Sequence, residues 1–201
     1  MGNVPLELNH WGPDFACWCT YKYLNSGPGS IGGCFVHERH ADRTDLNRFA
    51  GWWGHRKDDR FKMEHHFVAS PGASGYMLSN PPVLECAVVR ASLELFLEAG
   101  GVESLRTKSL ALTGYLEFLL KQKLPTVEII TPSDCRYRGC QLSLRLPVNI
   151  KKVYEDLQNE GVIVDTREPD AMRVAPCPLY NSFSDVHDLV EILADLIGRV
   201  Q

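Results

Sequence analysis

The chain has 201 residues, of which 44% are hydrophobic and 23% are charged, and its formal net charge is −4. This is the size of one large domain or two small ones, with the composition of an ordinary globular protein. The negative charge and the lack of a basic run argue against nucleic-acid binding. No apolar stretch approaches the roughly 20 residues of a membrane span, and no signal-peptide pattern opens the chain.

The seven cysteines are scattered along the chain and suggest no disulfide framework. Cys17 and Cys19 are too close for the usual metal knuckle, and Cys135 and Cys140 lack a second pair. We therefore expect no metal site and a reduced protein of the cytoplasm.

Residues 13–36 are predicted to form a strand, a glycine-rich turn and a second strand. Lys22 lies on the connection, among aromatic residues. An amine in an apolar, partly dry pocket has a lowered pKa, and the neutral amine can form a Schiff base with an aldehyde. The glycines of residues 27–33 would let the backbone approach a bulky cofactor. On residue types alone, the simpler alternative is a lysine that lies along the hairpin with its amine in water.

Residues 37–78 are polar and irregular, as expected of a functional or flexible connection that lines a site. Asn80 is then predicted to cap a helix that begins at Pro81 and runs from Val83 to Ala99. Gly100 and Gly101 end this helix. Its apolar residues at near-helical spacing are Leu84, Val88, Ala91 and Leu95.

A second helix is predicted over residues 102–123, ended by Leu124 and Pro125. Short strands (126–131, 141–146, 162–165 and 172–175) alternate with a helix over 149–159, and a last helix is capped by Ser184. Together they predict a sheet with helices packed on it. Each of these two helices has a stripe of apolar residues along one face. In the second helix the stripe is Leu105, Leu112, Leu116, Leu119 and Leu120, and in the last helix it is Val186, Leu189, Leu193 and Ile197.

Five side chains have a chemical case of their own. The Tyr21 phenol could donate to a phosphate or shuttle a proton, and the Trp52 indole N–H could reach a phosphate oxygen. Asn80 at a helix N-terminus marks an anion site. The planar guanidinium of Arg173 can bind a carboxylate through two parallel hydrogen bonds. The structural alternatives are aromatic packing for Tyr21 and Trp52, plain capping for Asn80 and a solvated surface position for Arg173. An isolated histidine such as His55 is more often a structural residue than a catalytic one.

Several segments closely resemble kynureninase, a pyridoxal-phosphate enzyme, in the order of that family and over nearly the whole chain. The resemblance begins with the lysine segment and ends near the last helix. The segments are Asp14 to Asn25, Ala50 to His55, Ser79 to Pro82, Leu112 to Glu117, Arg138 to Leu142 and Arg173 to Phe183.

The resemblance implies an α/β fold, the C-terminal part of a fold-type I pyridoxal-phosphate-dependent transferase. Residues 1–100 would be the end of the large cofactor domain, with the active-site loop and connecting helix. Residues 101–201 would be the small C-terminal α+β domain. The family also implies a homodimer with composite active sites, in which Trp52 and Asn80 reach the cofactor of the partner.

The reaction implied is hydrolysis of the Cβ–Cγ bond of L-kynurenine or 3-hydroxykynurenine, which yields anthranilate or its 3-hydroxy form and L-alanine. By resemblance, Lys22 holds the pyridoxal 5'-phosphate and moves protons with Tyr21. Tyr21, Trp52 and Asn80 bind the cofactor phosphate. Arg173 binds the substrate carboxylate, and the substrate ring lies near His55, Ser79 and Asn80.

Kynureninases are roughly twice as long, and the aspartate that pairs with the pyridine nitrogen precedes the region that resembles residues 2–4. We therefore expect this chain to be N-terminally truncated and to be inactive or very poor alone. Two alternatives stay open. One is a non-catalytic fragment that dimerises with the full-length enzyme. The other is a further lysine-Schiff-base enzyme such as a desulfurase, although desulfurases typically have histidine where Tyr21 stands.

Overall fold

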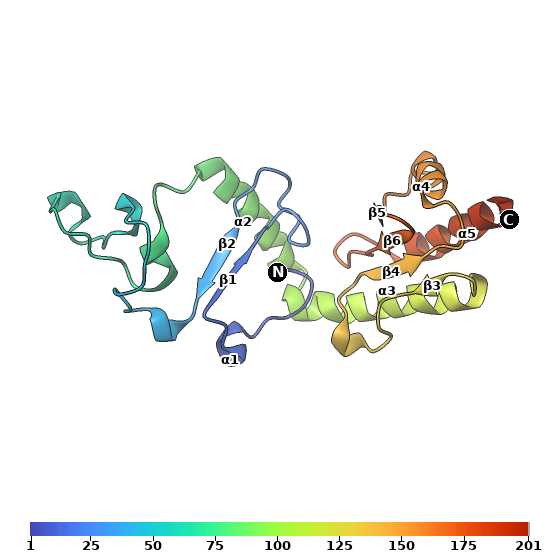
Figure 1. Cartoon of the computed structure of the whole chain (residues 1–201), viewed down its shortest axis with the longest axis horizontal. Coiled ribbons are helices and arrows are strands. Elements are labelled where there is room, and N and C mark those ends of the chain that lie inside the picture. Colours follow the sequence, from blue (N-terminus) through green and yellow to red (C-terminus); the bar gives the residue numbers. More distant parts are fainter. Residues whose placement is uncertain (201) are drawn as a thin grey trace. The chain divides into compact units, whose positions relative to one another are not determined.

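The computed structural model describes residues 1–200 and divides into two compact units (Figure 1). The first unit is Met1–Leu95, and the second begins at Phe96. Within residues 1–200, no helix is long and apolar enough to cross a membrane.

The first unit contains a short helix, α1 (Leu8–Trp11), and an antiparallel pair of strands, β1 (Phe15–Trp18) and β2 (Gly33–Val36). Phe15 lies opposite Val36, and Trp18 lies opposite Gly33. The predicted strand, turn and strand are confirmed, and Lys22 lies on the connection between the strands.

Residues 37–82 wind through turns with almost no regular structure, as the sequence predicts. One isolated bridge pairs His55 with Ala69. Short 3₁₀ turns are the only helical elements that the structure describes in this stretch: Glu38–His40, Trp52–Gly54, Arg60–Lys62 and Gly72–Tyr76.

The helix α2 spans Val83–Glu98, so the predicted helix is confirmed but its predicted cap is wrong. The first carbonyl used by the helix is that of Pro82, which accepts from the Cys86 N–H at 3.1 Å. A residue that precedes a proline is pushed away from helical geometry. Asn80 and Pro81 both precede prolines, and the helix therefore starts beyond them.

The second unit has three helices and a four-stranded antiparallel sheet in the order β3-β4-β6-β5. This matches the predicted sheet with helices packed on it. The elements are α3 (Gly101–Lys123), β3 (Glu128–Ile129), β4 (Leu142–Arg145), α4 (Ile150–Asn159), β5 (Asp165–Arg167), β6 (Ala171–Val174) and α5 (Phe183–Val200).

The hydrophobic core lies in the second unit. Helix α5 packs against α3 and α4, and the fully buried side chains include Leu112 and Leu116 of α3, Leu144 of β4 and Leu193 of α5. The predicted stripes of α3 and α5 are buried throughout, so the helical spacing of leucines identified both core faces correctly.

Several boundaries of the second unit differ from the prediction, and two of these differences have a visible cause. Ser182, not Ser184, caps α5: its hydroxyl accepts from the Asp185 N–H at 3.2 Å, while Asp185 accepts from the Ser182 N–H at 2.8 Å. This reciprocal pair is a capping box, with the acid three residues after the serine. The strand predicted from residue 162 starts at Asp165, because the Val162 N–H closes the end of α4 on the Leu157 carbonyl.

Candidate functional site

Lys22 lies on a compact loop whose first turn is closed by the Asn25 N–H, which donates to the Lys22 carbonyl at 2.9 Å. The side chain is exposed, and its Nζ lies 5.6 Å from the centroid of the Tyr21 ring. Tyr21 is exposed as well. The apolar, partly dry pocket predicted around the lysine is therefore not formed by the residues that the structure describes.

Three hydroxyl groups hold the lysine loop together, a feature that the sequence analysis missed. The Ser26 hydroxyl donates to Thr20 Oγ1 at 2.8 Å and lies 2.6 Å from Ser30 Oγ. Thr20 Oγ1 also bonds the Ile31 carbonyl. Because Thr20 and Ser26 are buried, these bonds fix the path of the loop on both sides of Lys22.

The loop is tied to helix α2 through its one buried apolar residue. Leu24 is buried, and its carbonyl accepts a hydrogen bond from the hydroxyl of the buried Ser92 in α2. The position of Lys22 relative to α2 is thus set two residues away, by packing and by a bond to the backbone.

Gly33, the last of the glycines of residues 27–33, has a structural reason of its own. A Cβ added to Gly33 would lie 2.6 Å from the ring of Trp18, its partner across the strand pair. Glycine is therefore needed there because the tryptophan ring covers the backbone.

Trp52 is half exposed, and its indole N–H donates to the Arg60 carbonyl at 3.3 Å instead of facing an open anion site. Its ring meets that of Phe61 edge to face at 5.4 Å. Trp53 packs under the Arg60 guanidinium, whose central carbon lies 4.4 Å from the ring centroid.

His55 is buried, and both of its ring nitrogens are engaged. Nδ1 accepts from the Val68 N–H at 3.2 Å, so Nε2 carries the proton toward Asp59 Oδ1, 3.0 Å away. A hydrogen bond from Arg56 and the nearby charge of its guanidinium hold the pKa of Asp59 below its ordinary value. In this arrangement His55 organises its loop and presents no free ring nitrogen to a ligand.

Ser79 and Asn80 are exposed and lie just before α2. Gly51 packs so closely on the backbone of Leu78 that an added Cβ would lie 2.1 Å from the Leu78 Cα. Trp52 and Ser79, the next residues along the chain, therefore follow two segments whose backbones are in contact.

Arg173 lies on β6, in the second unit, directly opposite Asp165 of β5. Its guanidinium forms an ion pair with Asp165, which also pairs with Arg167 at 2.6 Å. The Arg173 Nε is buried and has no hydrogen-bond partner within residues 1–200. The guanidinium already holds one carboxylate and keeps a donor unused.

Two of the segments that carry the sequence resemblance meet in a buried ion pair. Glu117 of α3 pairs with Arg138 at 2.6 Å and with Lys121 at 2.5 Å, and the Thr113 hydroxyl donates to the Cys140 carbonyl at 3.1 Å. Burial raises the pKa of Glu117, but hydrogen bonds from Lys121, Ser133 and Arg138 outweigh it and hold the pKa at about 2. These contacts join α3 to the segment before β4.

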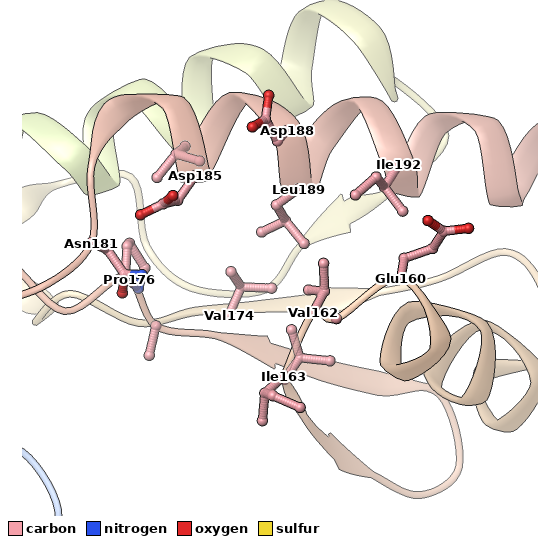
Figure 2. A pocket seen from close by; sticks show the side chains of 14 residues that line it. Glu160, Val162, Ile163, Val174, Pro176, Asn181, Asp185, Asp188, Leu189 and Ile192 are labelled. Atoms are coloured by element: carbon pink, nitrogen blue, oxygen red, sulfur yellow. The ribbon is translucent and has the colours of Figure 1, made fainter.

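A cavity of about 490 Å³ opens in the second unit between α5 and the segments that flank β5 and β6 (Figure 2). Val162, Val174 and Leu189 point into it, and Asp185 and Asp188 of α5 also border it. None of the predicted site residues lines it. Within residues 1–200 no cysteine forms a disulfide, and no group of three metal-ligating side chains gathers.

Comparison with solved structures defines the class of fold. The cystine C-S lyase C-DES in complex with cysteine persulfide matches with a TM-score of 0.79 and 21% identity, over 96% of this chain and 49% of its own. The cysteine desulfurase CsdA from Escherichia coli matches with a TM-score of 0.77 and 16% identity, over 100% and 50% of the two chains. The chain thus has the fold of the C-terminal part of fold-type I pyridoxal-phosphate-dependent enzymes.

The sequence comparisons are more specific. Residues 105–193 match the kynureninase C-terminal domain. The kynureninase of Xanthomonas campestris pv. campestris (strain B100) is 57% identical over 95% of this chain and 46% of its own length, and that of Nematostella vectensis is 51% identical over 96% and 44%. The chain is thus similar, over nearly its whole length, to about half of a kynureninase. It spans about half the length of the curated relatives that it matches.

Proposed function

We propose that this chain carries the lysine side of a kynureninase site, in which pyridoxal 5'-phosphate is held by Lys22 and the Cβ–Cγ bond of L-kynurenine or 3-hydroxykynurenine is hydrolysed. The observation that carries the proposal is the 57% identity to a kynureninase over 195 residues that include Lys22. One solved relative by fold is a form of C-DES with glycine covalently linked to its pyridoxal-phosphate cofactor.

Lys22 of the first unit is accessible to such a cofactor. The Lys22 amine is exposed, and within residues 1–200 no carboxylate pairs with it, so an aldehyde can reach it. The bound cofactor would act as the electron sink of the reaction. Lys22 would hold it and move protons together with the neighbouring Tyr21. The phenolic hydroxyl of Tyr21 can both donate and accept a hydrogen bond.

The other predicted residues have supporting roles in this proposal. Trp52 and Asn80 would bind the phosphate, and Ser79 and His55 would lie near the substrate ring. Since the Trp52 N–H donates to a backbone carbonyl, that bond must be exchanged for one to phosphate. Arg173 would bind the substrate carboxylate in place of Asp165, with which its guanidinium now pairs. A homodimer with composite sites is part of the proposal.

The first test is an absorbance spectrum of the purified chain with pyridoxal phosphate, followed by borohydride reduction and mapping of the label by mass spectrometry. We expect a visible-wavelength band that reduction fixes on Lys22. Lys22→Ala should lower the label at least about tenfold, because the nucleophilic amine is gone.

Lys62→Ala is the matched control, since Lys62 is also an exposed lysine of the first unit. It should leave both the band and the label unchanged. Equal labelling of the wild-type chain and Lys22→Ala would contradict the proposal, because the cofactor would then react with surface lysines at random.

A further inference from the structure

The cavity of Figure 2 contains none of the predicted site residues, and its volume of about 490 Å³ falls within the roughly 300–1,000 Å³ of small-molecule pockets. Its walls belong wholly to the second unit. Val174 of β6 and Leu189 of α5 line the cavity and are also members of the hydrophobic core cluster. The packing of the core therefore holds two walls of the cavity in place.

The lining of the cavity is largely apolar. Val162, Val174 and Leu189 point into it, and Ile163 borders it although this side chain is 80% exposed. Apolar surface that water reaches is stabilised when an apolar ligand covers it. The lining thus suits a ligand with a hydrocarbon or aromatic body.

The charged residues that border the cavity are all acidic. They are Glu160, which follows α4, and Asp185 and Asp188 of α5. Among the described residues, no lysine, arginine or histidine lines the cavity. The hydrogen bond from the Ser182 N–H holds the pKa of Asp185 below its ordinary value, so this carboxylate is charged at neutral pH. An acidic rim of this kind favours a ligand with a positive charge.

Glu160 stands at the end of the cavity where a cation is favoured twice. It is the C-cap residue of α4, and the C-terminal end of a helix dipole attracts positive charge. Lys152 and Arg199 border a neighbouring hollow together with Glu160, but each pairs with another carboxylate, Lys152 with Asp156 and Arg199 with Asp195. The charge of Glu160 is therefore left for a ligand.

We propose that this cavity binds an organic cation, an alkyl or arylalkyl amine without a carboxylate. Its apolar body would lie on Val162, Val174 and Leu189, and its ammonium group in the field of Glu160 and Asp188. An amino acid would bring a carboxylate to the same acidic rim and be repelled, so this site differs in kind from one for the substrate of the proposed reaction. The inference rests on the shape and charge of the second unit and is independent of the proposed function.

The test is a titration of the 201-residue chain, labelled at its isoleucine, leucine and valine methyl groups, with three probes of similar shape. 2-Phenylethylamine is positively charged, 2-phenylethanol is neutral and 3-phenylpropionate is negatively charged. Pyridoxal phosphate is left out, because an amine would react with it. The amine should shift the methyl resonances of Val162, Val174 and Leu189. Its Kd should be at least about threefold lower than that of the alcohol and at least about tenfold lower than that of the carboxylate.

The double variant Glu160→Gln/Asp188→Asn removes two of the three charges and keeps Asp185, which caps α5. It should weaken binding of the amine at least about threefold and change binding of the alcohol by less than about twofold, because only the charge is lost. Glu155→Gln/Asp195→Asn is the matched control. It removes the same charge from exposed positions of α4 and α5 that do not line the cavity, and it should leave both probes unaffected.

Three results would each overturn the inference. One is the absence of saturable binding of the amine, and another is binding of the carboxylate probe as tight as that of the amine. The third is a set of methyl shifts that excludes the cavity. A preference for the amine that survives unchanged in Glu160→Gln/Asp188→Asn would likewise show that the acidic rim does not select the ligand.

Discussion

Replacing Leu116 by alanine is expected to lower the free energy of unfolding of the second unit by about 2–5 kcal/mol. Leu116 lies in the middle of α3, is 0% exposed and belongs to the core cluster with residues of β4, β6, α4 and α5. The substitution removes buried methyl groups and leaves a cavity that four elements would have to close. Urea unfolding followed by far-ultraviolet circular dichroism measures the change, since most of the helix lies in this unit.

Phe118, two residues further on, is the matched control, because it lies on the same helix but is 57% exposed. Phe118→Ala should cost less than about 1 kcal/mol. Similar losses at both positions would mean that α3 is not packed as described.

The second large effect is expected at Glu117. Its side chain is 10% exposed and lies against Arg138, which is also buried. Glu117→Gln keeps the shape but leaves the Arg138 charge without its counter-ion, and removing one partner of a buried pair costs about 3–5 kcal/mol. Lys121, the other partner of Glu117, is half exposed, so the loss of its counter-ion costs less stability. We therefore expect a total cost near the lower limit of this range.

The same pair predicts a dependence on pH. The folded pKa of Glu117 is about 2 and its ordinary value is 4.5, so the folded state binds its proton less readily than the unfolded state. The contribution of Glu117 is therefore complete above pH 4.5 and is lost as the pH falls toward 2; a shift of this size corresponds to roughly 3 kcal/mol. The stabilities of wild type and Glu117→Gln should accordingly converge in acid.

Glu128→Gln provides the comparison at the surface. Glu128 pairs with Arg145 at 2.6 Å, but both side chains are about half exposed. Its loss should cost less than about 1 kcal/mol. If Glu117→Gln were as mild as Glu128→Gln, the buried pair would not be a stabilising link between α3 and the segment before β4.

The helices of the second unit were predictable because leucine spacing reports burial directly, and their stripes proved to be the core. The caps were less predictable. Asn80 has the right residue type, but the two prolines after it delay α2 to Val83. In α5, the choice between Ser182 and Ser184 depended on the acid three residues later, Asp185, which the sequence does display.

The candidate site was predictable only in part. The position of Lys22 on a loop between two strands follows from local pattern, and its exposure does not, because burial of a side chain depends on chain far away in sequence. The hydrogen bond of the Trp52 indole and the engagement of both His55 nitrogens are likewise tertiary facts. The bond from Ser26 to Thr20 could have been suspected, since hydroxyl side chains are common in tight loops.

The uneven distribution of buried apolar side chains has a calorimetric consequence. The heat-capacity increase on melting comes chiefly from newly exposed apolar surface, at about 12–15 cal/mol/K per residue in an ordinary domain. Since the core lies in the second unit, the chain alone should show about 1.2–1.5 kcal/mol/K, the value for roughly 100 residues. Differential scanning calorimetry would thus register a protein about half as large as this one.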